Sequence, residues 1–370
     1  MGWWLILLPA CVIWAGILMM PWRPWSTAES LDAAGPIEDD FDDVTVLIPA
    51  RNEADIIGST LQGLVRLGPR LKIILVDDQS EDDTVSIARS LALANLRIIT
   101  GQPLPPGWSG KLWALEQGRA YADTGLILLL DADIELQPGL LHGLRSRLRD
   151  DPLDLISLMA ELRMVGPWER LLMPAFIYFF KLLYPFALSN SSTNKRVAAA
   201  AGGCLLTRTH LLEELGGFAP IKEALIDDCA LAYQFKARGK KTWIGLTHSV
   251  RSLRSYPGLT GIWNMVARTA FTQLRHSMSL LILCSGVMII AFVTPLIGLF
   301  APSGWIVLLS IGTLAIMMLS YLPILRYYGL SSAWSLALPG VGVLYLMMTW
   351  TSAVRYRRFG ERSRWKGRVY

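Results

Sequence analysis

The distribution of charge along the chain limits its possible folds more than any other feature. Residues 1–22 carry no charged side chain, and between His276 and Val354 the only charged residue is Arg326. Such long apolar stretches leave no polar face for water, so we expect both ends to lie in lipid and the middle to fold as a globular domain. A soluble bundle of buried helices is the alternative for the C-terminal stretch.

Residues 1–22 are predicted to form an N-terminal transmembrane anchor. The apolar run is close to the ~20 residues that cross the hydrocarbon core of a bilayer as a helix. A cleaved signal peptide is the competing interpretation, but the run lacks both a basic start and a small-x-small cleavage site. Residues 23–43 are acidic and contain Ala, Gly and Pro, which predicts a linker.

The C-terminal region, residues 278–354, is predicted to contain up to three transmembrane helices, at 280–300, 305–325 and 333–354. The following residues, 355–370, form a basic tail of net charge +6, which leaves −1 for the rest of a chain whose total is +5. A short basic run beside a membrane span is typical of the cytoplasmic side, so the charge does not indicate a nucleic-acid partner. The four cysteines are scattered and suggest neither a disulfide framework nor a zinc site.

Between the two apolar ends, short strand patterns alternate with helical patterns. The expected strands are 44–48, 72–76, 97–99 and 126–130, and the expected helices are 55–65, 84–94 and 112–122. This alternation predicts an α/β fold with a mostly parallel sheet, whose ligands bind at the carboxyl ends of the strands. Neither a dinucleotide-binding Gly-x-Gly-x-x-Gly turn nor a phosphate-binding P-loop follows any strand, which argues against an oxidoreductase or a P-loop NTPase.

Asp131 and Asp133 come directly after the last of these strands. Extended residues two apart project to the same side, and two carboxylates aimed at one point repel each other unless a cation lies between them. Mg²⁺ or Mn²⁺, held by one or two carboxylates with water and phosphate oxygens, fits this arrangement. A solvated pair in a loop is the alternative, because Asp-x-Asp alone is common.

Two further acidic pairs are candidates for a site. Asp77-Asp78 ends the second strand, where a carboxylate can accept hydrogen bonds from a nucleobase or ribose; helix capping with Ser80 is the structural alternative. Asp227-Asp228 opens an apparent helix at 229–237, where the helix dipole favours acidic residues. The functional interpretation of this last pair is a general base for a hydroxyl acceptor.

Taken together, these motifs resemble the family 2 glycosyltransferases of GT-A fold, over roughly residues 44–277. The resemblance lies in Pro49-x-x-Asn52-Glu53, Asp77-Asp78-x-Ser80, Asp131-x-Asp133 and the later acidic pair, in this order. Gly110-Lys111-x-x-Ala114, Gly202-Gly203-Cys204 and Leu215-Gly216-Gly217-Phe218 are also similar to stretches of that family. The plan of one N-terminal and several C-terminal apolar segments is most similar to bacterial hopanoid-associated membrane glycosyltransferases, and more distantly to ceramide glucosyltransferases.

The resemblance implies an inverting transfer of a sugar from a nucleotide sugar, a UDP-sugar, to a lipid hydroxyl, with Mg²⁺ or Mn²⁺ as cofactor. It implies donor binding by Pro49, Asn52, Glu53, Asp77, Asp78, Lys111 and Asp131, with Glu53 and Asp78 on the uridine. It also implies a metal held by Asp131 and Asp133, Asp228 as the catalytic base beside Asp227, and an acceptor or product side with Gly203, Gln273 and Arg275.

Other functions stay open. Many membrane-bound members carry Gln-x-x-Arg-Trp, whereas this chain has only Arg268 and Gln273-Leu274-Arg275, which argues against a processive polysaccharide synthase. A polyprenyl-phosphate or polysaccharide glycosyltransferase remains an alternative. From other classes, a nucleotidyl- or phosphotransferase would use the same carboxylate and metal chemistry, and a non-catalytic membrane scaffold would need none of it.

The expected location is the cell inner membrane, with several spans and a cytoplasmic catalytic domain, because nucleotide sugars are made in the cytosol. Residues 168–188, broken by two prolines, are expected to lie along the membrane surface, with Phe176, Tyr178, Phe179 and Phe180 toward lipid or acceptor; a buried helix is the alternative. Three complete C-terminal spans would leave the basic tail outside, against the positive-inside rule. We therefore expect residues 333–354, interrupted by Pro339-Gly340 and Gly342, to be re-entrant or to lie on the surface.

Overall fold

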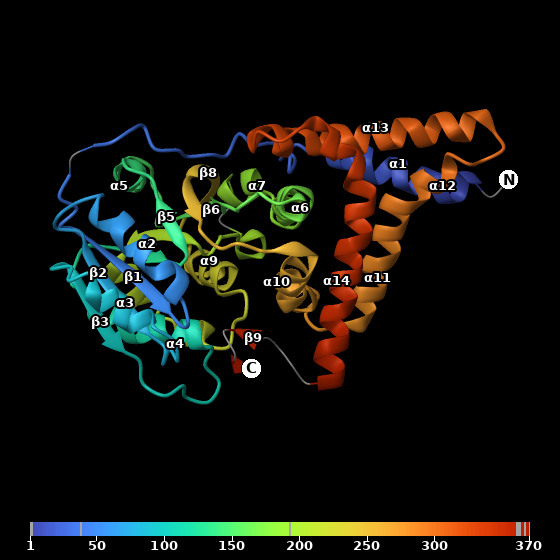
Figure 1. The fold of residues 1–370 in the computed structure, drawn as a ribbon. Coiled ribbons are helices and arrows are strands. Elements are labelled where there is room, and N and C mark those ends of the chain that lie inside the picture. Colours follow the sequence, from blue (N-terminus) through green and yellow to red (C-terminus); the bar gives the residue numbers. More distant parts are fainter. Residues whose placement is uncertain (1–2, 38, 192–193, 360–363, 366–367, 370) are drawn as a thin grey trace.

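The fold is built on a single mixed sheet in the N-terminal two thirds of the chain (Figure 1). The computed structural model describes residues 3–37, 39–191, 194–359, 364–365 and 368–369. The eight strands lie in the order β3-β2-β1-β4-β7-β6-β8-β5, and only β7 and β5 run against the others. The strands are β1 (Val44–Ala50), β2 (Lys72–Asp77), β3 (Leu96–Thr100), β4 (Leu126–Leu130), β5 (Ile134–Leu136), β6 (Leu155–Glu161), β7 (Cys204–Arg208) and β8 (Thr242–Ser252).

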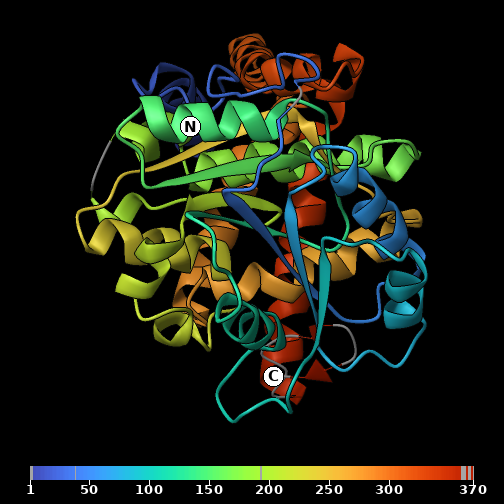
Figure 2. The same ribbon diagram turned by 90° about the vertical axis from the view of Figure 1, so that its left-hand side faces the viewer.

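Helices cover both faces of this sheet and form a second group beside it (Figures 1 and 2). Those of the sheet domain are α2 (Ala54–Val65), α3 (Thr84–Ser90), α4 (Gly110–Arg119), α5 (Leu140–Asp150), α8 (Thr209–Glu214) and α9 (Asp227–Ala237). The others are α1 (Trp3–Met19), α6 (Pro167–Leu183), α7 (Phe186–Ser191), α10 (Gly258–Gln273), α11 (Met278–Met288), α12 (Thr294–Gly298), α13 (Gly304–Tyr327) and α14 (Leu338–Phe359), with the short helical segments η3 (Ile289–Val293) and η4 (Ser332–Ala337).

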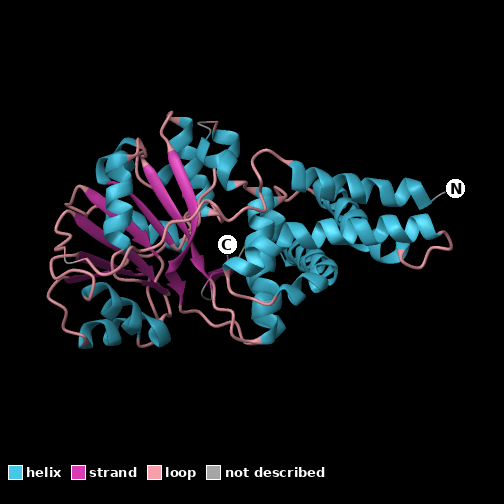
Figure 3. Cartoon of the chain, turned by 90° about the horizontal axis from the view of Figure 1, so that it is seen from above, coloured by secondary structure: helices cyan, strands magenta, loops and turns pink. Residues whose placement is uncertain are grey.

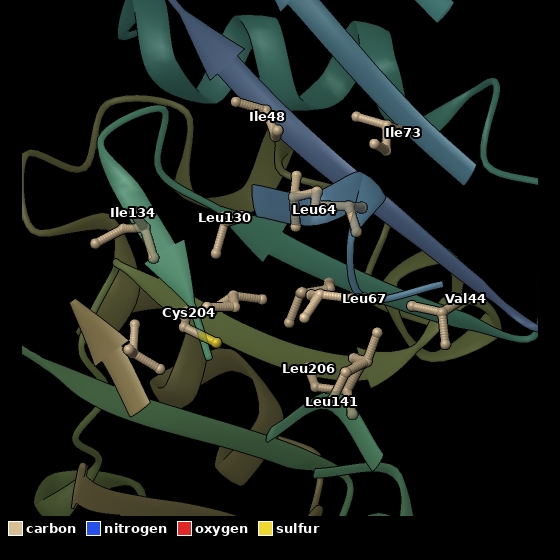
Figure 4. Close-up of a cluster of buried hydrophobic side chains, with 14 of the residues drawn as sticks. Val44, Ile48, Leu64, Leu67, Ile73, Leu130, Ile134, Leu141, Cys204 and Leu206 are labelled. Carbon is tan, nitrogen blue, oxygen red and sulfur yellow. The ribbon is translucent and has the colours of Figure 1, made fainter. Parts of the chain in front are cut away.

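The core of the sheet domain has two apolar layers, one on each face of the sheet. Val44 and Ile48 of β1 face the layer shared with α2 and α5, which includes Leu64 and Leu141 (Figure 4). Leu47, between them, faces the opposite layer with α4, α8 and α9. This alternation follows from the two-residue period of a strand, and the burial of such side chains contributes about 1.5–3 kcal/mol each. The expected α/β fold with a mostly parallel sheet is confirmed.

The strands predicted from sequence agree with the structure to within two residues, but the second half of the sheet was not predicted. The helix expected at 84–94 ends at Ser90, and Ala92 then adopts a left-handed conformation with φ 48°. Strands β5 to β8 and helix α5 lie in residues for which the sequence patterns gave no elements. Short apolar runs such as β6 have no periodicity that separates a strand from a buried helix.

The predicted linker, residues 23–43, is attached to the sheet domain. The backbone N–H of Leu31 donates to the carbonyl of Leu246 in β8 at 3.0 Å, and the N–H of Leu246 donates to the carbonyl of Glu29 at 2.8 Å. The Asp32 carboxylate accepts from the His248 backbone N–H at 2.6 Å. Backbone pairing with a buried strand fixes the position of this segment, so it connects α1 to the domain along a defined path (Figure 1).

Helix α6 contains most of residues 168–188, the segment expected to lie along the membrane surface. Tyr178 is fully buried and its hydroxyl lies 2.7 Å from that of Ser320 in α13. Phe179 packs edge-on against Tyr345 of α14, with ring centroids 4.9 Å apart. Of the four aromatic side chains expected to meet lipid or acceptor, Tyr178 is buried and Phe176, Phe179 and Phe180 are half-buried, because α6 lies between the sheet and the C-terminal helices (Figure 1). This packing favours the buried-helix alternative for the middle of the segment, whereas Trp168 and Leu183 near its ends are exposed.

Among the residues that the structure describes, four segments are long and apolar enough to cross a membrane: 167–191, 278–298, 304–327 and 332–358. They do not form one parallel bundle. Helices α1 and α13 lie side by side and extend away from the sheet domain, whereas α11 and α14 run across them (Figures 1 and 3). The π-helical turn η3 and Pro295 lie where the 278–298 segment bends between α11 and α12. The orientation of α14 therefore differs from that of α13, although both have the composition of a span.

Candidate active site

The predicted carboxylates meet at one edge of the sheet because of how the strands pair. Strand β7 is antiparallel to β4, with Cys204 opposite Leu130, so the residues before β7 lie beside those after β4. The backbone N–H of Asp131 donates to the carbonyl of Gly203 at 3.2 Å. Strand β8 runs parallel to β6, and its carboxyl end reaches the same edge, two residues before Arg254.

A cavity of about 440 Å³ opens at this edge. Its acidic side chains come from the loops after β1 and β4 and from the start of α9. Its basic side chains come from α4, the loop after β8 and α10. The charged residues of the lining are Glu53, Asp131, Asp133 and Asp227, with Lys111, Arg254 and Arg268. The cavity thus combines carboxylates and cations within the space of a drug-sized ligand.

Lys111 joins two of the predicted carboxylates. Its Nζ lies 2.9 Å from Oδ1 of Asp131 and 3.0 Å from Oδ2 of Asp227. Burial raises the pKa of Asp131, while Lys111 opposes that effect. Burial also lowers the pKa of Lys111, but the two carboxylates outweigh it and hold that pKa above its usual value. Lys111 therefore stays protonated and neutralises part of the acidic charge.

Arg254 makes a second bridge of the same kind on the other side of the cavity. Its Nε donates to Oδ2 of Asp133 at 2.8 Å, and its terminal nitrogen donates to the two oxygens of Glu53 at 2.8 and 3.1 Å. Although burial lowers the pKa of Arg254, Asp133 and Glu53 raise it above its usual range. Each metal-binding candidate thus has a cation of the protein on one oxygen.

The remaining oxygens of Asp131 and Asp133 fit a divalent cation. In the described part of the chain, Asp131 Oδ2 and Asp133 Oδ1 have no hydrogen-bond partner. Among the same residues, no group of three or more His, Cys, Asp or Glu side chains is arranged to hold a metal. Two carboxylates suffice for Mg²⁺ or Mn²⁺ only when water and phosphate oxygens complete the coordination. The site therefore fits a cation that binds together with a diphosphate.

Asp228 lies just behind the main cavity. With Gly202 and Lys111 it lines a small pocket that shares residues with the cavity, whereas Asp227 lines both. Burial, and next the charge of Asp227, raise the pKa of Asp228 to about 7. A Cβ at Gly202 would lie 3.2 Å from the Lys111 Nζ and 3.5 Å from the Asp228 carboxylate, so this position favours glycine. A carboxylate with such a pKa can accept a proton at neutral pH.

The predicted donor residues after β1 and β2 form a tightly bonded double loop. Oδ1 of Asn52 accepts from the Glu81 backbone N–H at 2.8 Å, and Oδ1 of Asp77 accepts from the Ser80 N–H at 3.1 Å. Asp78 is fully buried, and its N–H donates to the carbonyl of Ala50 at 2.8 Å. Of the residues predicted for donor binding, Pro49, Glu53, Lys111 and Asp131 line the cavity. Asn52, Asp77 and Asp78 instead hold the loops beside it in place.

The residues predicted for the acceptor side lie apart from the cavity lining. Gly203 contributes its carbonyl to Asp131, as described above. Gln273 accepts a hydrogen bond from the Tyr184 hydroxyl at 2.7 Å, and Tyr184 in turn lies beside Cys229, next to Asp228. Arg275 is exposed in the turn after α10 with φ 51°. Gln273 is thus linked through Tyr184 to the neighbourhood of Asp228. Neither Gln273 nor Arg275 lines the described cavity.

Sequence reasoning gave no cavity role to Arg254, Tyr256, Asn264 or Arg268, although all four line the cavity. The available signal was the eleven-residue strand β8, because Arg254 lies two positions after its end at Ser252. A cation at the carboxyl end of a strand would have been a candidate by the argument used for Asp131. Arg268 carries no such signal, because only the packing of α10 brings it to the sheet edge.

Comparison with known proteins agrees with these motifs. Residues 45–216 match the family model described as Glycosyl transferase family 2. The chain is 34% identical to the 4,4'-diaponeurosporenoate glycosyltransferase of Staphylococcus haemolyticus over 93 residues. This matched stretch covers 25% of this chain and 24% of that protein. The protein of the same name from Staphylococcus aureus strain Newman is 33% identical over 91 residues, with the same shares covered. The chain thus spans about a quarter of the length of the curated relatives it matches.

A solved structure resembles the whole chain. The mannosyltransferase PcManGT from Pyrobaculum calidifontis, in complex with GDP-Man and Mn²⁺, covers 97% of this chain and 100% of its own, with a TM-score of 0.55 and 18% sequence identity. At that identity the likeness shows the fold alone. The fold class expected from the sequence, a GT-A domain with apolar helices long enough to span a membrane, is confirmed. Residues 45–216 thus carry a glycosyl transferase family 2 domain within a chain of GT-A-like fold.

Proposed function

We propose that the protein is a membrane-bound glycosyltransferase that moves a sugar from a nucleotide sugar to an oxygen of a lipid acceptor. The observation that carries this proposal is the cavity in which Asp131 and Asp133 face Lys111 and Arg254, with Asp228 adjoining. The family match over residues 45–216 supports the same chemistry. A UDP-sugar is the proposed donor, with its uridine beside Glu53 and its diphosphate beside the aspartates.

A divalent cation, Mg²⁺ or Mn²⁺, is the proposed cofactor, held by the available oxygens of Asp131 and Asp133. It would offset the negative charge that develops on the departing nucleoside diphosphate. Lys111 and Arg254 add two positive charges in the same cavity and can stabilise that charge as well. Because both cations are already bonded to carboxylates, they are pre-positioned and need little reorganisation during the reaction.

Asp228 is the proposed base for a hydroxyl acceptor. The acceptor oxygen attacks the anomeric carbon, its proton passes to the Asp228 carboxylate, and the bond from that carbon to the diphosphate oxygen breaks, with its electron pair leaving on the nucleotide. Attack opposite the leaving group inverts the configuration at the anomeric carbon. The raised pKa of Asp228, about 7, supports this role over one for Asp227, which is paired with Lys111.

The arrangement of the apolar helices supports one membrane placement. Helix α13 has 24 residues, about 36 Å of helix, and extends from the domain beside α1 (Figures 1 and 3). The turn between α12 and α13 lies at the end of this group furthest from the sheet (Figure 1), and Phe300 in this turn is 88% exposed. We place α1, α13 and the η3–α12 part of the 278–298 segment within the bilayer, with α11 and α14, which run across them, along its cytoplasmic surface. This placement puts the catalytic domain and the basic tail on the same, cytoplasmic side.

The acceptor is proposed to be a lipid, because the catalytic cavity adjoins helices with exposed apolar side chains. The similarity of the segment plan to hopanoid-associated enzymes makes a hopanoid-related alcohol one candidate. The names of the staphylococcal relatives point to another, a carotenoid acid. A carboxylate nucleophile carries no proton, so the two candidates differ in their need for Asp228.

The test is a product analysis with the full-length protein in a neutral detergent. UDP- and GDP-sugars are offered with a bacterial membrane lipid extract and Mn²⁺ or Mg²⁺, and products are identified by mass. We expect a lipid that gains one sugar residue, and loss of that product in Asp133→Asn. Transfer of a nucleotide instead of a sugar would assign the chain to the nucleotidyltransferases, and absence of any product with every donor would contradict catalysis.

A further inference from the structure

The cavity has a second wall, which the proposed donor chemistry does not use. It is one face of α10, formed by Gly261, Asn264, Met265 and Arg268. Their spacing of three, four and seven residues places all four on a single helix face. The opposite face of α10 buries Ile262 and Val266 among the C-terminal helices. The open cavity therefore lies between the carboxylates at the sheet edge and α10, on which Asn264 and Arg268 are exposed.

Arg268 differs from the other two cations of the cavity. Lys111 is paired with Asp131 and Asp227, and Arg254 with Asp133 and Glu53, as described above. Within the part of the chain that the structure describes, the Arg268 guanidinium makes neither a hydrogen bond nor an ion pair; its electrostatic neighbour is the Tyr256 phenol. A guanidinium in a cavity with no protein carboxylate bound to it is suited to a carboxylate or phosphate from outside.

The same helix connects the cavity to the apolar outer surface. Asn264, in the cavity wall, accepts a hydrogen bond from Arg355 of α14 at 2.8 Å. Trp263 donates from its indole N–H to the Thr351 hydroxyl of α14 at 3.1 Å. On their outer sides α14 and α11 expose large apolar side chains, among them Trp350, Met347, Ile282 and Leu283. The paired helices α10 and α14 thus lie between this apolar surface and the cavity.

We propose that the α10 wall is the acceptor subsite, and that it binds the anionic head, a carboxylate or a phosphate, of a membrane amphiphile through Arg268. This inference rests on the proposed function and narrows it to acceptors with a negative head. The cations paired with the aspartates serve the donor side, and Arg268 serves the acceptor side. The two substrates are thereby bound by different cations of one cavity.

Direct binding to the full-length protein in neutral nanodiscs tests the subsite without requiring turnover. The probes are laurate, dodecyl phosphate and dodecanol, which share a tail and differ in the head. We expect the two anions to bind at least tenfold more tightly than dodecanol, and this preference to vanish in Arg268→Gln. Arg268→Lys should restore part of it, and Arg89→Gln, an equal loss of charge at an exposed position on α3, should leave it unchanged. Comparison of the affinities for laurate and dodecyl phosphate then shows whether the subsite prefers a carboxylate or a phosphate head.

Three results would overturn the inference. Weaker binding of UDP or GDP in Arg268→Gln would assign Arg268 to the donor. Equal preferences in wild type and Arg268→Gln would make it an ordinary surface residue. Inorganic phosphate or acetate binding as tightly as the amphiphiles would identify a soluble anion as the ligand. Failure of the proposed function looks different: the head-group preference would persist while no sugar reaches any acceptor.

Discussion

The guanidinium of Arg254 lies against Asp133, with its Nε 2.8 Å from the carboxylate Oδ2. One oxygen of Asp133, a carboxylate proposed to hold a metal, is thus already bonded to a cation of the protein. A divalent ion and Arg254 share the negative charge of Asp133, so each weakens the attraction of the other for it. Binding of the metal without the nucleotide should therefore be weak, because the phosphate oxygens that complete its coordination are missing.

Replacement of Arg254 by Gln should separate metal binding from donor binding. With its cation removed, Asp133 should bind Mn²⁺ alone more tightly than in the wild type. The nucleotide, which loses a charged hydrogen-bond donor worth about 1.5–3 kcal/mol, should bind roughly tenfold to a hundredfold more weakly. Both constants can be measured by titration calorimetry. Arg251→Gln, which removes an exposed arginine paired with Glu161, is the control and should change neither.

Asp133→Asn should abolish turnover while leaving the fold intact. The amide keeps the size of the side chain, and its loss of charge removes a ligand for the metal. Stabilisation of the leaving group by several kcal/mol corresponds to a loss of about a hundredfold or more in kcat. EDTA should have the same effect on the wild type. Circular dichroism and thermal unfolding verify the fold, and full activity in chelator would remove the metal from the mechanism.

Asp228→Asn should lower transfer to alcohol acceptors by about a hundredfold to ten-thousandfold while the nucleotide still binds. Because the pKa of Asp228 is raised to about 7, the wild-type rate should increase as the pH rises through that value and the carboxylate ionises. The variant should lack this increase. If Asp227→Asn is the more damaging change, the base is the residue paired with Lys111. With a carboxylate acceptor, Asp228→Asn should retain transfer, since no proton has to be removed.

The membrane placement is tested with single cysteines and an impermeant thiol reagent in intact cells, in a background without the native cysteines. Ser303→Cys, in the exposed turn before α13, should label before lysis. Ser86→Cys in the sheet domain and Arg368→Cys in the basic tail should label only after lysis. Labelling of Ser86→Cys in intact cells would contradict the cytoplasmic domain. Labelling of Arg368→Cys in intact cells, with Ser86→Cys still protected, would mean that α14 also crosses.

Part of the site could be predicted because its signals are local. Asp131 and Asp133 follow a strand with a spacing of two, and that spacing alone directs both carboxylates to one side. Asp228 was predicted as one of an acidic pair at a helix start. Whether Asp227 or Asp228 faces the main cavity depends on how α9 packs, and the structure places Asp227 there and Asp228 behind it.

The sequence by itself determined the division into apolar ends and a charged α/β domain, since apolar length and strand–helix alternation are properties of neighbouring residues. Only the tertiary structure decided which charges meet. Arg254 reaches Asp133 through the pairing of β5 with β8, across 121 positions of the chain. It also decided the direction of α14, whose composition is that of a span but which lies across α13 (Figure 1). Composition depends on each residue alone, whereas ion pairs and helix orientation depend on packing between distant segments.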